Sequence, residues 1–215
     1  MLCVSIAGVG FEECKTALKD LELAEIRLDT LHFTTRQVQD LFSSRPQLIA
    51  TFRPGTISED ERNDFLMTAI DAGAAYVDIE IEAADRFKES IIKKARQKGC
   101  HIIISYHNYE KTPSRKELLE IIDGCFDCGA DIAKIACLTL SEADSARILS
   151  LYDCPESLMG RILALGMGEK GKITRIAALL LGAPFTFAAP TPGHETAPGQ
   201  LDRDTVKKMI DLMQR

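Results

Sequence analysis

Short apolar runs rich in β-branched residues alternate along the whole chain with longer segments in which apolar residues recur at the period of a helix. Runs of the first kind predict buried strands, and segments of the second kind predict amphipathic helices. The predicted strands cover residues 2–7, 24–28, 48–52, 76–80, 101–106, 132–136, 161–165 and 184–188. The predicted helices cover residues 11–20, 34–43, 58–72, 84–98, 114–128, 141–151, 171–181 and 202–213. The sequence therefore predicts eight successive strand–helix units.

Residues that begin and end helices agree with this division. A serine followed three residues later by an acidic residue predicts a capping box, in which each side chain bonds the backbone amide of the other. Three predicted helices begin in this way, with Ser58 and Glu61, Ser114 and Glu117, and Ser141 and Asp144. Glycine is the residue that most easily ends a helix, and it stands at positions 73, 99, 129 and 182.

Strict alternation of strand and helix implies a parallel sheet with right-handed crossovers. Such a sheet is either open and doubly wound or closed into a barrel. The turn after the first strand has Gly8 and Gly10 but lacks the third glycine of a dinucleotide-binding loop. Eight units in 215 residues give about 27 residues each, which fits a barrel. We therefore predict an α/β fold in which residues 1–215 form a single (β/α)8 TIM barrel, with its site at the C-terminal ends of the strands.

Composition excludes several classes of protein. The chain has 26 Lys and Arg against 32 Asp and Glu, with both signs interspersed, which disfavours nucleic-acid binding. Its seven scattered cysteines, and an N-terminus without a signal-peptide pattern, predict a cytoplasmic location. The longest apolar stretch, residues 176–190, is interrupted by Gly182 and Pro184 and is too short to span a bilayer. No membrane association is expected.

Charged residues occupy three successive strand ends. Glu80 ends the fourth predicted strand, His107 follows the fifth, and Lys134 lies within the sixth, inside the apolar run 130–136. The spacing is 27 residues in both steps, so the three side chains should lie at equivalent depth. Because side chains alternate along a strand, Lys134 shares a face with Ile132 and Ala136, and Glu80 shares one with Asp78. These charged residues therefore point into the barrel.

Each of the three has an ordinary structural explanation, such as an ion pair or a lysine that reaches solvent, but their joint spacing favours chemistry. Burial in an apolar strand disfavours an ammonium and frees the lone pair of the amine. Lys134 is then a nucleophile that condenses with a ketone to an iminium. His107 removes a proton and later protonates a departing hydroxyl, and Glu80 orients the imidazole.

Arginines form a second pattern at the predicted mouth of the barrel. Arg27 shares a strand face with Glu25, Arg53 directly follows the third strand, and Arg175 lies early in the seventh helix. A guanidinium group binds a carboxylate through two hydrogen bonds, so the expected substrate is an anionic, hydroxylated small molecule. The Pro- and Gly-rich segment 190–200 is long for a barrel loop and is predicted to act as a lid.

These residues resemble the type I 3-dehydroquinate dehydratase family along nearly the whole chain. The matching segments are Cys3-Val4-Ser5-Ile6, Glu25-Ile26-Arg27-Leu28-Asp29, Thr51-Phe52-Arg53, Val77-Asp78-Ile79-Glu80, Ser105-Tyr106-His107-Asn108-Tyr109 with Thr112-Pro113, 130–136, Gly166-Met167-Gly168 with Gly171 and Arg175, and Ala197-Pro198-Gly199-Gln200. The resemblance implies a (β/α)8 barrel of the shikimate pathway, commonly a homodimer, that dehydrates 3-dehydroquinate through a lysine Schiff base without a metal or cofactor.

The resemblance also implies roles for individual residues. Lys134, His107 and Glu80 match the catalytic positions. The substrate-binding positions are Ser5, Glu25, Arg27, Arg53, Met167, Arg175, Phe187, Thr196 and Gln200. At Thr196 the family pattern has a serine, and the hydroxyl is retained.

Other interpretations of the same sequence remain open. The glycines at 166, 168 and 171 could form a phosphate-binding loop, which would indicate a class I aldolase acting on sugar phosphates. The chain could also be an inactive barrel used for binding, although Glu80, His107 and Lys134 are all present. Cys125 and Cys128 have redox-motif spacing, but no second pair of ligands has matching spacing. We expect them to be packing residues.

Overall fold

The computed structural model describes residues 1–44, 47–55 and 57–213. Its strands form one parallel sheet with the order β7-β6-β5-β4-β3-β2-β1-β8. The strands are β1 (Leu2–Ile6), β2 (Leu23–Arg27), β3 (Gln47–Thr51), β4 (Tyr76–Glu80), β5 (His101–Asn108), β6 (Ile132–Leu138), β7 (Ile162–Met167) and β8 (Thr186–Ala188). Strand β1 pairs with both β2 and β8, so the sheet curls round on itself.

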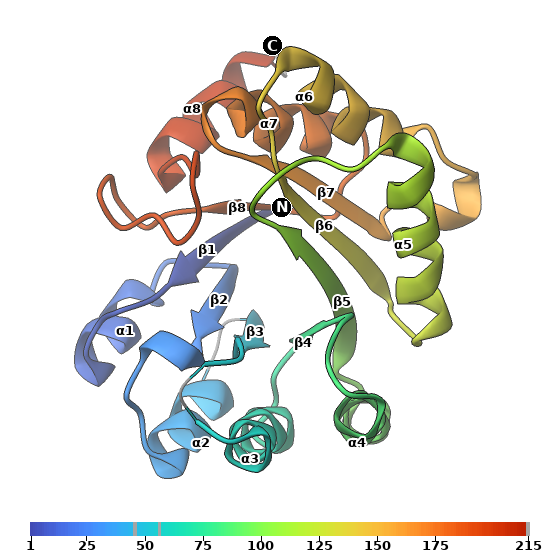
Figure 1. Ribbon diagram of the computed structural model, residues 1–215. Helices are drawn as coiled ribbons and strands as arrows, with labels where there is room; N and C mark the ends of the chain where they lie inside the picture. The colour runs from blue at the N-terminus through green and yellow to red at the C-terminus, as the bar shows by residue number, and fades with distance from the viewer. Residues whose placement is uncertain (45–46, 56, 214–215) are drawn as a thin grey trace.

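Helices alternate with the strands and lie outside the sheet, as Figure 1 shows. They are α1 (Phe11–Ala17), α2 (Thr35–Ser44), α3 (Glu59–Asp71), α4 (Asp85–Lys98), α5 (Arg115–Asp127), α6 (Glu142–Leu149), α7 (Lys172–Leu180) and α8 (Arg203–Met213). Helix α7 packs against both β7 and β8, the two ends of the hydrogen-bonded order. The fold is therefore a nearly closed (β/α)8 barrel, which confirms the predicted fold class.

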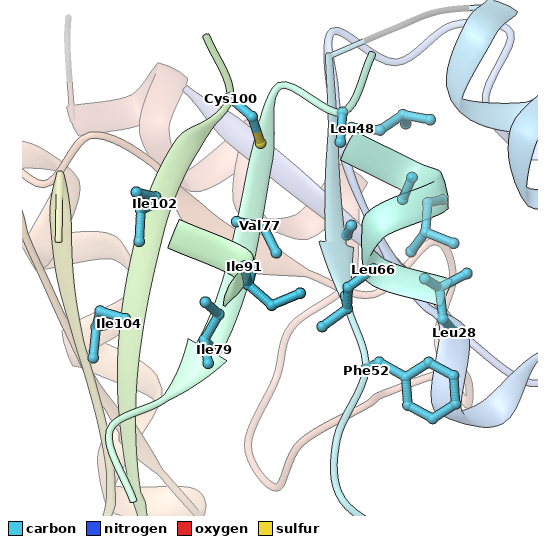
Figure 2. Close-up of a cluster of buried hydrophobic side chains, with 14 of the residues drawn as sticks. Leu28, Leu48, Phe52, Leu66, Val77, Ile79, Ile91, Cys100, Ile102 and Ile104 are labelled. Atoms are coloured by element: carbon cyan, nitrogen blue, oxygen red, sulfur yellow. The ribbon is translucent and has the colours of Figure 1, made fainter. Parts of the chain in front are cut away.

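Apolar residues fill the space between strands and helices. Figure 2 shows Val77 and Ile79 of β4 packing outward with Leu66 of α3 and Ile91 of α4, and all four are buried. These are the residues opposite the inward face of β4, which confirms the predicted alternation. The amphipathic pattern of the helices is thus explained by burial of one face against the sheet.

The interior of the barrel is divided along its axis. Its N-terminal half is filled by apolar side chains from successive strands, among them Leu23, Ile49, Ile103, Leu163 and Phe185. One inward position further along, β2 to β6 carry the polar residues Glu25, Thr51, Asp78, Ser105 and Lys134, whereas β7 and β8 stay apolar with Leu165 and Phe187. The polar groups therefore gather on β2 to β6, toward the C-terminal ends. The apolar side chains of the N-terminal half exclude water from that end of the barrel, so the polar groups are reached only from the C-terminal end.

Most predicted element boundaries differ from the observed ones by one to three residues. Strand β4 matches its prediction, whereas β5 extends to Asn108 and β6 to Leu138. His107 therefore lies within β5 and does not follow it, because β5 and β6 remain paired as far as Asn108 and Cys137. His107 and Asn108 interrupt the apolar pattern at the end of β5, which is why the sequence predicts a shorter strand there. Cys137 and Leu138 continue the apolar run of β6, so its end is simply predicted too early.

The predicted helix signals are largely confirmed. Ser114 and Ser141 form complete capping boxes, and Ser58 accepts a hydrogen bond from the amide of Glu61. Gly99 ends α4 with a φ of 70°, in the left-handed region. Within the described part of the chain, no helix is both long and apolar enough to cross a membrane.

Candidate active site

Lys134 lies in the middle of β6, and its side chain points into the barrel. Only 6% of the residue is exposed, and Ile132 and Ala136 on the same face are also buried. The Nζ atom donates a hydrogen bond of 2.7 Å to Oδ2 of Asp78. It also lies 4.5 Å from the centre of the Phe187 ring. The amine is thus buried as predicted, but its charged form is stabilised by a neighbouring carboxylate.

Asp78 is a site residue that the sequence prediction does not include. It is completely buried, and its second oxygen, Oδ1, accepts from Nη1 of Arg53 at 2.8 Å and from Oγ of Ser105 at 2.6 Å. Burial raises the pKa of Asp78, but the charges of Arg53 and Lys134 lower it by more, so the pKa lies well below its ordinary value. The sequence signals for Asp78 are its place on the inward face of β4 and its position in the matching segment Val77-Asp78-Ile79-Glu80.

His107 lies at the mouth of the barrel with its ring stacked on Tyr109. The ring centres are 6.2 Å apart and the ring planes differ by 12°. No other group in the described chain forms a hydrogen bond with the imidazole. Burial lowers the pKa of His107, the charges of Arg53 and Lys134 lower it further, and Asp78 only partly opposes them. The imidazole is therefore neutral and able to accept a proton.

Glu80 does not have the predicted partner. Among the described residues no hydrogen bond joins it to His107, and both of its oxygens accept from guanidinium groups. Oε1 accepts from Nη1 of Arg53 at 2.6 Å, and Oε2 accepts from Nη2 of Arg62. Arg62 is itself fixed, because its Nε donates to the carbonyl oxygen of Phe52 at 2.5 Å. Charge-assisted bonds to two arginines are stronger than a bond to a neutral ring, so Glu80 fixes Arg53 instead of the imidazole.

Glu25 of β2 is bonded to side chains of β1 and β3, and it lies on the side of Lys134 opposite to Asp78. Its Oε2 accepts from Oγ of Ser5 at 2.8 Å, and its Oε1 accepts from Oγ1 of Thr51 at 2.9 Å. Oε1 is also 3.9 Å from Nζ of Lys134. Nε2 of Gln200 lies 3.5 Å from Oγ of Ser5, so the loop before α8 joins the same group. Two carboxylates therefore flank the amine.

The three predicted arginines differ in how their charges are balanced. Arg27 forms two hydrogen bonds with Asp29, at 3.0 and 2.7 Å, and Arg53 is held by carboxylates as described. Arg175 is 2% exposed and has no carboxylate partner among the described residues. Its Nε is unbonded, and Nη2 reaches only the carbonyl oxygen of Pro198, at 3.4 Å. Burial lowers the pKa of Arg175 to about 10. An unpaired buried guanidinium is costly unless an anion joins it.

The segment 190–200 is fixed at its second half. Oε1 of Gln200 accepts from the amide and hydroxyl of Thr196, at 2.7 and 3.1 Å. The amide of Gly168 donates to the carbonyl oxygen of Pro198 at 3.0 Å. Gly199 has a φ of 71°, and a Cβ there would stand 2.2 Å from the oxygen of Gly168. This contact positions Thr196 and Gln200 at the mouth, while lid motion stays a prediction.

A pocket of about 530 Å³, its open mouth included, lies at the C-terminal ends of the strands. Every predicted site residue except Glu80 lines it: Ser5, Glu25, Arg27, Arg53, His107, Lys134, Met167, Arg175, Phe187, Thr196 and Gln200. The prediction does not include four other lining residues, Tyr109, Ala136, Leu165 and Ala197. Tyr109 is 66% exposed, and the sequence signal for it is its place in the matching segment Ser105-Tyr106-His107-Asn108-Tyr109.

The cysteine motif lies apart from this pocket. Cys125 is fully buried in α5, and burial raises its pKa to about 12, so the thiol is not reactive. Groups of three or more metal-binding side chains do not occur in the part of the chain that the structure describes.

A nearly closed barrel with ionisable side chains gathered at the carboxyl ends of its strands defines a (β/α)8-barrel enzyme. The family model for type I 3-dehydroquinase matches residues 2–215. The chain belongs to this family.

Individual relatives agree with the family match. The 3-dehydroquinate dehydratase of Methanocaldococcus jannaschii is 36% identical over 227 residues, which cover 99% of both chains. The crystal structure of the 3-dehydroquinate dehydratase from Aquifex aeolicus VF5 is 25% identical, covers 100% of both chains and has a TM-score of 0.82. The type I 3-dehydroquinate dehydratase of Clostridium difficile superposes with a TM-score of 0.86, covering 99% of this chain and 91% of its own, at 24% identity. The last likeness concerns the fold alone.

Proposed function

We propose that the protein dehydrates 3-dehydroquinate to 3-dehydroshikimate, as a step of the shikimate pathway, through a Schiff base on Lys134. The observation that carries this proposal is the position of Lys134, a buried amine in the same pocket as a neutral imidazole and a guanidinium whose Nε is unpaired. Family membership supports the substrate. An elimination from a carboxylated ketone through an imine requires an amine, a base and a group that binds the carboxylate.

The proposed reaction has four steps. The amine of Lys134 attacks the C3 ketone, and loss of water gives an iminium. His107 takes a proton from C2, which leaves an enamine. The enamine expels the C1 hydroxyl in a syn elimination, and His107 returns its proton to that hydroxyl as water leaves. Hydrolysis of the conjugated iminium then consumes one water and frees the product and the amine.

Recognition of the substrate is proposed to divide between the charged and the apolar parts of the pocket. Arg175 binds the carboxylate, because its Nε and the rest of its fork have no internal acidic partner. Glu25, Arg27 and Arg53, together with Ser5, Thr196 and Gln200, bind hydroxyl groups. Met167 and Phe187 are each no more than 5% exposed, and they form the apolar wall beside the ring of the substrate.

Borohydride reduction in the presence of 3-dehydroquinate tests the mechanism. We expect a stable adduct on Lys134, found by peptide mass spectrometry, and none in Lys134→Ala. The same variant should stay folded and lose the rise in absorbance that marks the conjugated product. Full turnover in Lys134→Ala, or an adduct on another lysine, contradicts the proposal.

The class I aldolase alternative loses its supporting feature. A phosphate loop needs free backbone amides, but the amides of this turn bond within the protein. Gly166 N donates to Oγ1 of Thr174 at 2.7 Å, Gly168 N to Pro198, and Gly171 N to the oxygen of Gly168 at 3.1 Å. The turn therefore fixes α7 and the 190–200 loop instead of binding phosphate.

We also propose that the protein acts as a homodimer in the cytoplasm. Free cysteines at all seven positions support a reducing compartment. Six of the ten exposed large apolar side chains in the described chain lie on α7, on α8 or directly after α7. They are Ile173, Leu180, Leu181, Met209, Leu212 and Met213. Since a twofold contact uses the same face of both copies, this face is the proposed interface.

A further inference from the structure

We propose that Asp78 is a positioning residue for the proposed reaction. It holds Nζ of Lys134 in place, and it remains the counter-ion when the amine becomes an iminium. This inference rests on the proposed function, because it assigns a role within the same site. It starts from a carboxylate that is completely buried and bonded directly to the reacting nitrogen, at 2.7 Å.

The carboxylate of Asp78 is fixed before substrate arrives. Its Oδ1 accepts from Nη1 of Arg53 at 2.8 Å and from Oγ of Ser105 at 2.6 Å, which leaves Oδ2 directed at Lys134. These contacts come from β5 and from the residue two positions after β3, so neighbouring parts of the barrel set the orientation. A charge held in this way stabilises a positive group without reorganising during the reaction.

Asp78 is not suited to take the proton that Lys134 must lose before it attacks. Arg53 and Lys134 stabilise its ionised form, and Oδ1 is already bonded twice. The neutral imidazole of His107 is the better acceptor in the pocket. Asp78 therefore stays charged throughout and faces an ammonium first and an iminium afterwards.

Other groups facing Nζ do not replace this contact. Glu25 of β2 lies 3.9 Å away, and its oxygens already accept from Ser5 and Thr51. The ring of Phe187 from β8 contributes only its face, at 4.5 Å. The charges of Arg53 after β3 and Arg175 of α7, and the imidazole of His107 on β5, do not stabilise a cation. Asp78 is thus the closest anion to the nitrogen.

Substitution of Asp78 by Asn tests the inference, because Asn keeps the shape and removes the charge. Adduct formation with 3-dehydroquinate is followed by rapid mixing, borohydride quench and mass spectrometry across the pH range. We expect the maximal rate of adduct formation to fall about 100-fold. The rising limb of its pH profile should also move to lower pH, because the ammonium loses its counter-ion. A merely structural role would not move the limb.

The matched control is Asp131→Asn. Asp131 is also an ion-paired aspartate, bonded to Arg96 at 2.8 Å, but it directly precedes β6 at the opposite end of the barrel. This variant should form the adduct at the wild-type rate and with the wild-type pH profile. Circular dichroism checks that each variant is folded.

If Asp78→Asn does not fold, Asp78→Glu decides the question. It keeps the charge but displaces the oxygens by one methylene, so the rate should fall about tenfold while the limb stays in place. An unchanged rate and limb in a folded Asp78→Asn protein, or an unchanged rate in Asp78→Glu, overturns this inference alone. Absence of any adduct in the wild type overturns the proposed function instead.

Discussion

The ionisation of single side chains determines what this pocket can do. Burial lowers the pKa of His107 and the charges of Arg53 and Lys134 lower it further, whereas at Asp78 the same two charges outweigh burial and lower the pKa of the carboxyl. The same two charges thus separate the roles of base and counter-ion, with His107 at the mouth and Asp78 completely buried. Titratable neighbours that push pKa values apart in this way are typical of acid–base sites.

The first prediction concerns the acid limb of the pH–rate profile. Burial and the charges of Arg53 and Lys134 lower the pKa of His107, so the imidazole stays deprotonated, and active as a base, below its ordinary value of about 6.5. We therefore expect the limb that His107 contributes to kcat to lie below that pH, since Lys134 is already bound to the substrate when His107 takes its proton. A pH series with 3-dehydroquinate measures it, and Arg53→Gln should move the limb upward. A wild-type limb centred at or above the ordinary value contradicts the assignment.

The second prediction distinguishes two roles for Glu80. If Glu80 fixes Arg53, as its bonds indicate, Glu80→Gln raises KM by about tenfold and leaves the pH limb of His107 in place. If Glu80 instead orients the imidazole, Glu80→Gln lowers kcat and moves the pH limb that His107 contributes. Steady-state kinetics across pH separate these outcomes. Arg62→Leu, which removes the other partner of Glu80, should reproduce a weaker form of the same change.

At the scale of elements, close backbone contacts position the arginine of α7. A Cβ at Gly171 would stand 2.4 Å from the backbone of Gly166, so α7 approaches β7 only with glycine at this position. Arg175 follows one helical turn later and depends on that approach to reach the pocket. The glycines at 166, 168 and 171, which the sequence offers as a possible phosphate-binding loop, thus allow α7 to pack closely against β7.

The third prediction follows from this contact. Gly171→Ala should lower the free energy of unfolding by about 1–3 kcal/mol, because α7 must move away from β7. It should also raise KM, since Arg175 moves with the helix. Thermal denaturation and steady-state kinetics measure both. Gly10→Ala is the matched control: its φ is −71° and nothing lies within 4 Å of the added carbon, so it should change stability by less than about 0.5 kcal/mol. Equal stability of the two variants contradicts the argument.

How much the sequence predicts depends on the range of the interaction concerned. Alternation along β4 and β6 correctly predicts that Asp78, Glu80 and Lys134 point inward, because it needs only the local period of a strand. Glu80 is bonded to Arg53 after β3 and to Arg62 of α3. Lys134 is bonded to Asp78, two strands away. No local pattern contains these contacts between elements. The sequence therefore predicts the residues of the pocket well and the pairing among its charges poorly.

At the scale of the whole molecule, the mouth of the pocket and the proposed dimer interface both involve α7. Arg175 is on its buried side, whereas Ile173 is 63% exposed on its outer side. Helix α8 adds Met209, Leu212 and Met213, which line an apolar groove with Ile173. A helix that is apolar on both sides is typical of one buried on both sides in the assembly.

The fourth prediction tests this interface. Leu212→Glu places a charge at the centre of the exposed apolar groove, so we expect the dimer to dissociate to monomers in sedimentation velocity at micromolar concentration. Met159→Glu is the control, because Met159 is 62% exposed in a segment before β7 and away from this groove. The control should sediment as the wild type does.

The Leu212→Glu monomer should still form the adduct on Lys134, since no residue of the pocket belongs to the groove. Helix α7 no longer packs against a partner in the monomer, so KM for 3-dehydroquinate should rise. A wild type that sediments as a monomer, or a Leu212→Glu protein that stays dimeric, excludes this face as the contact.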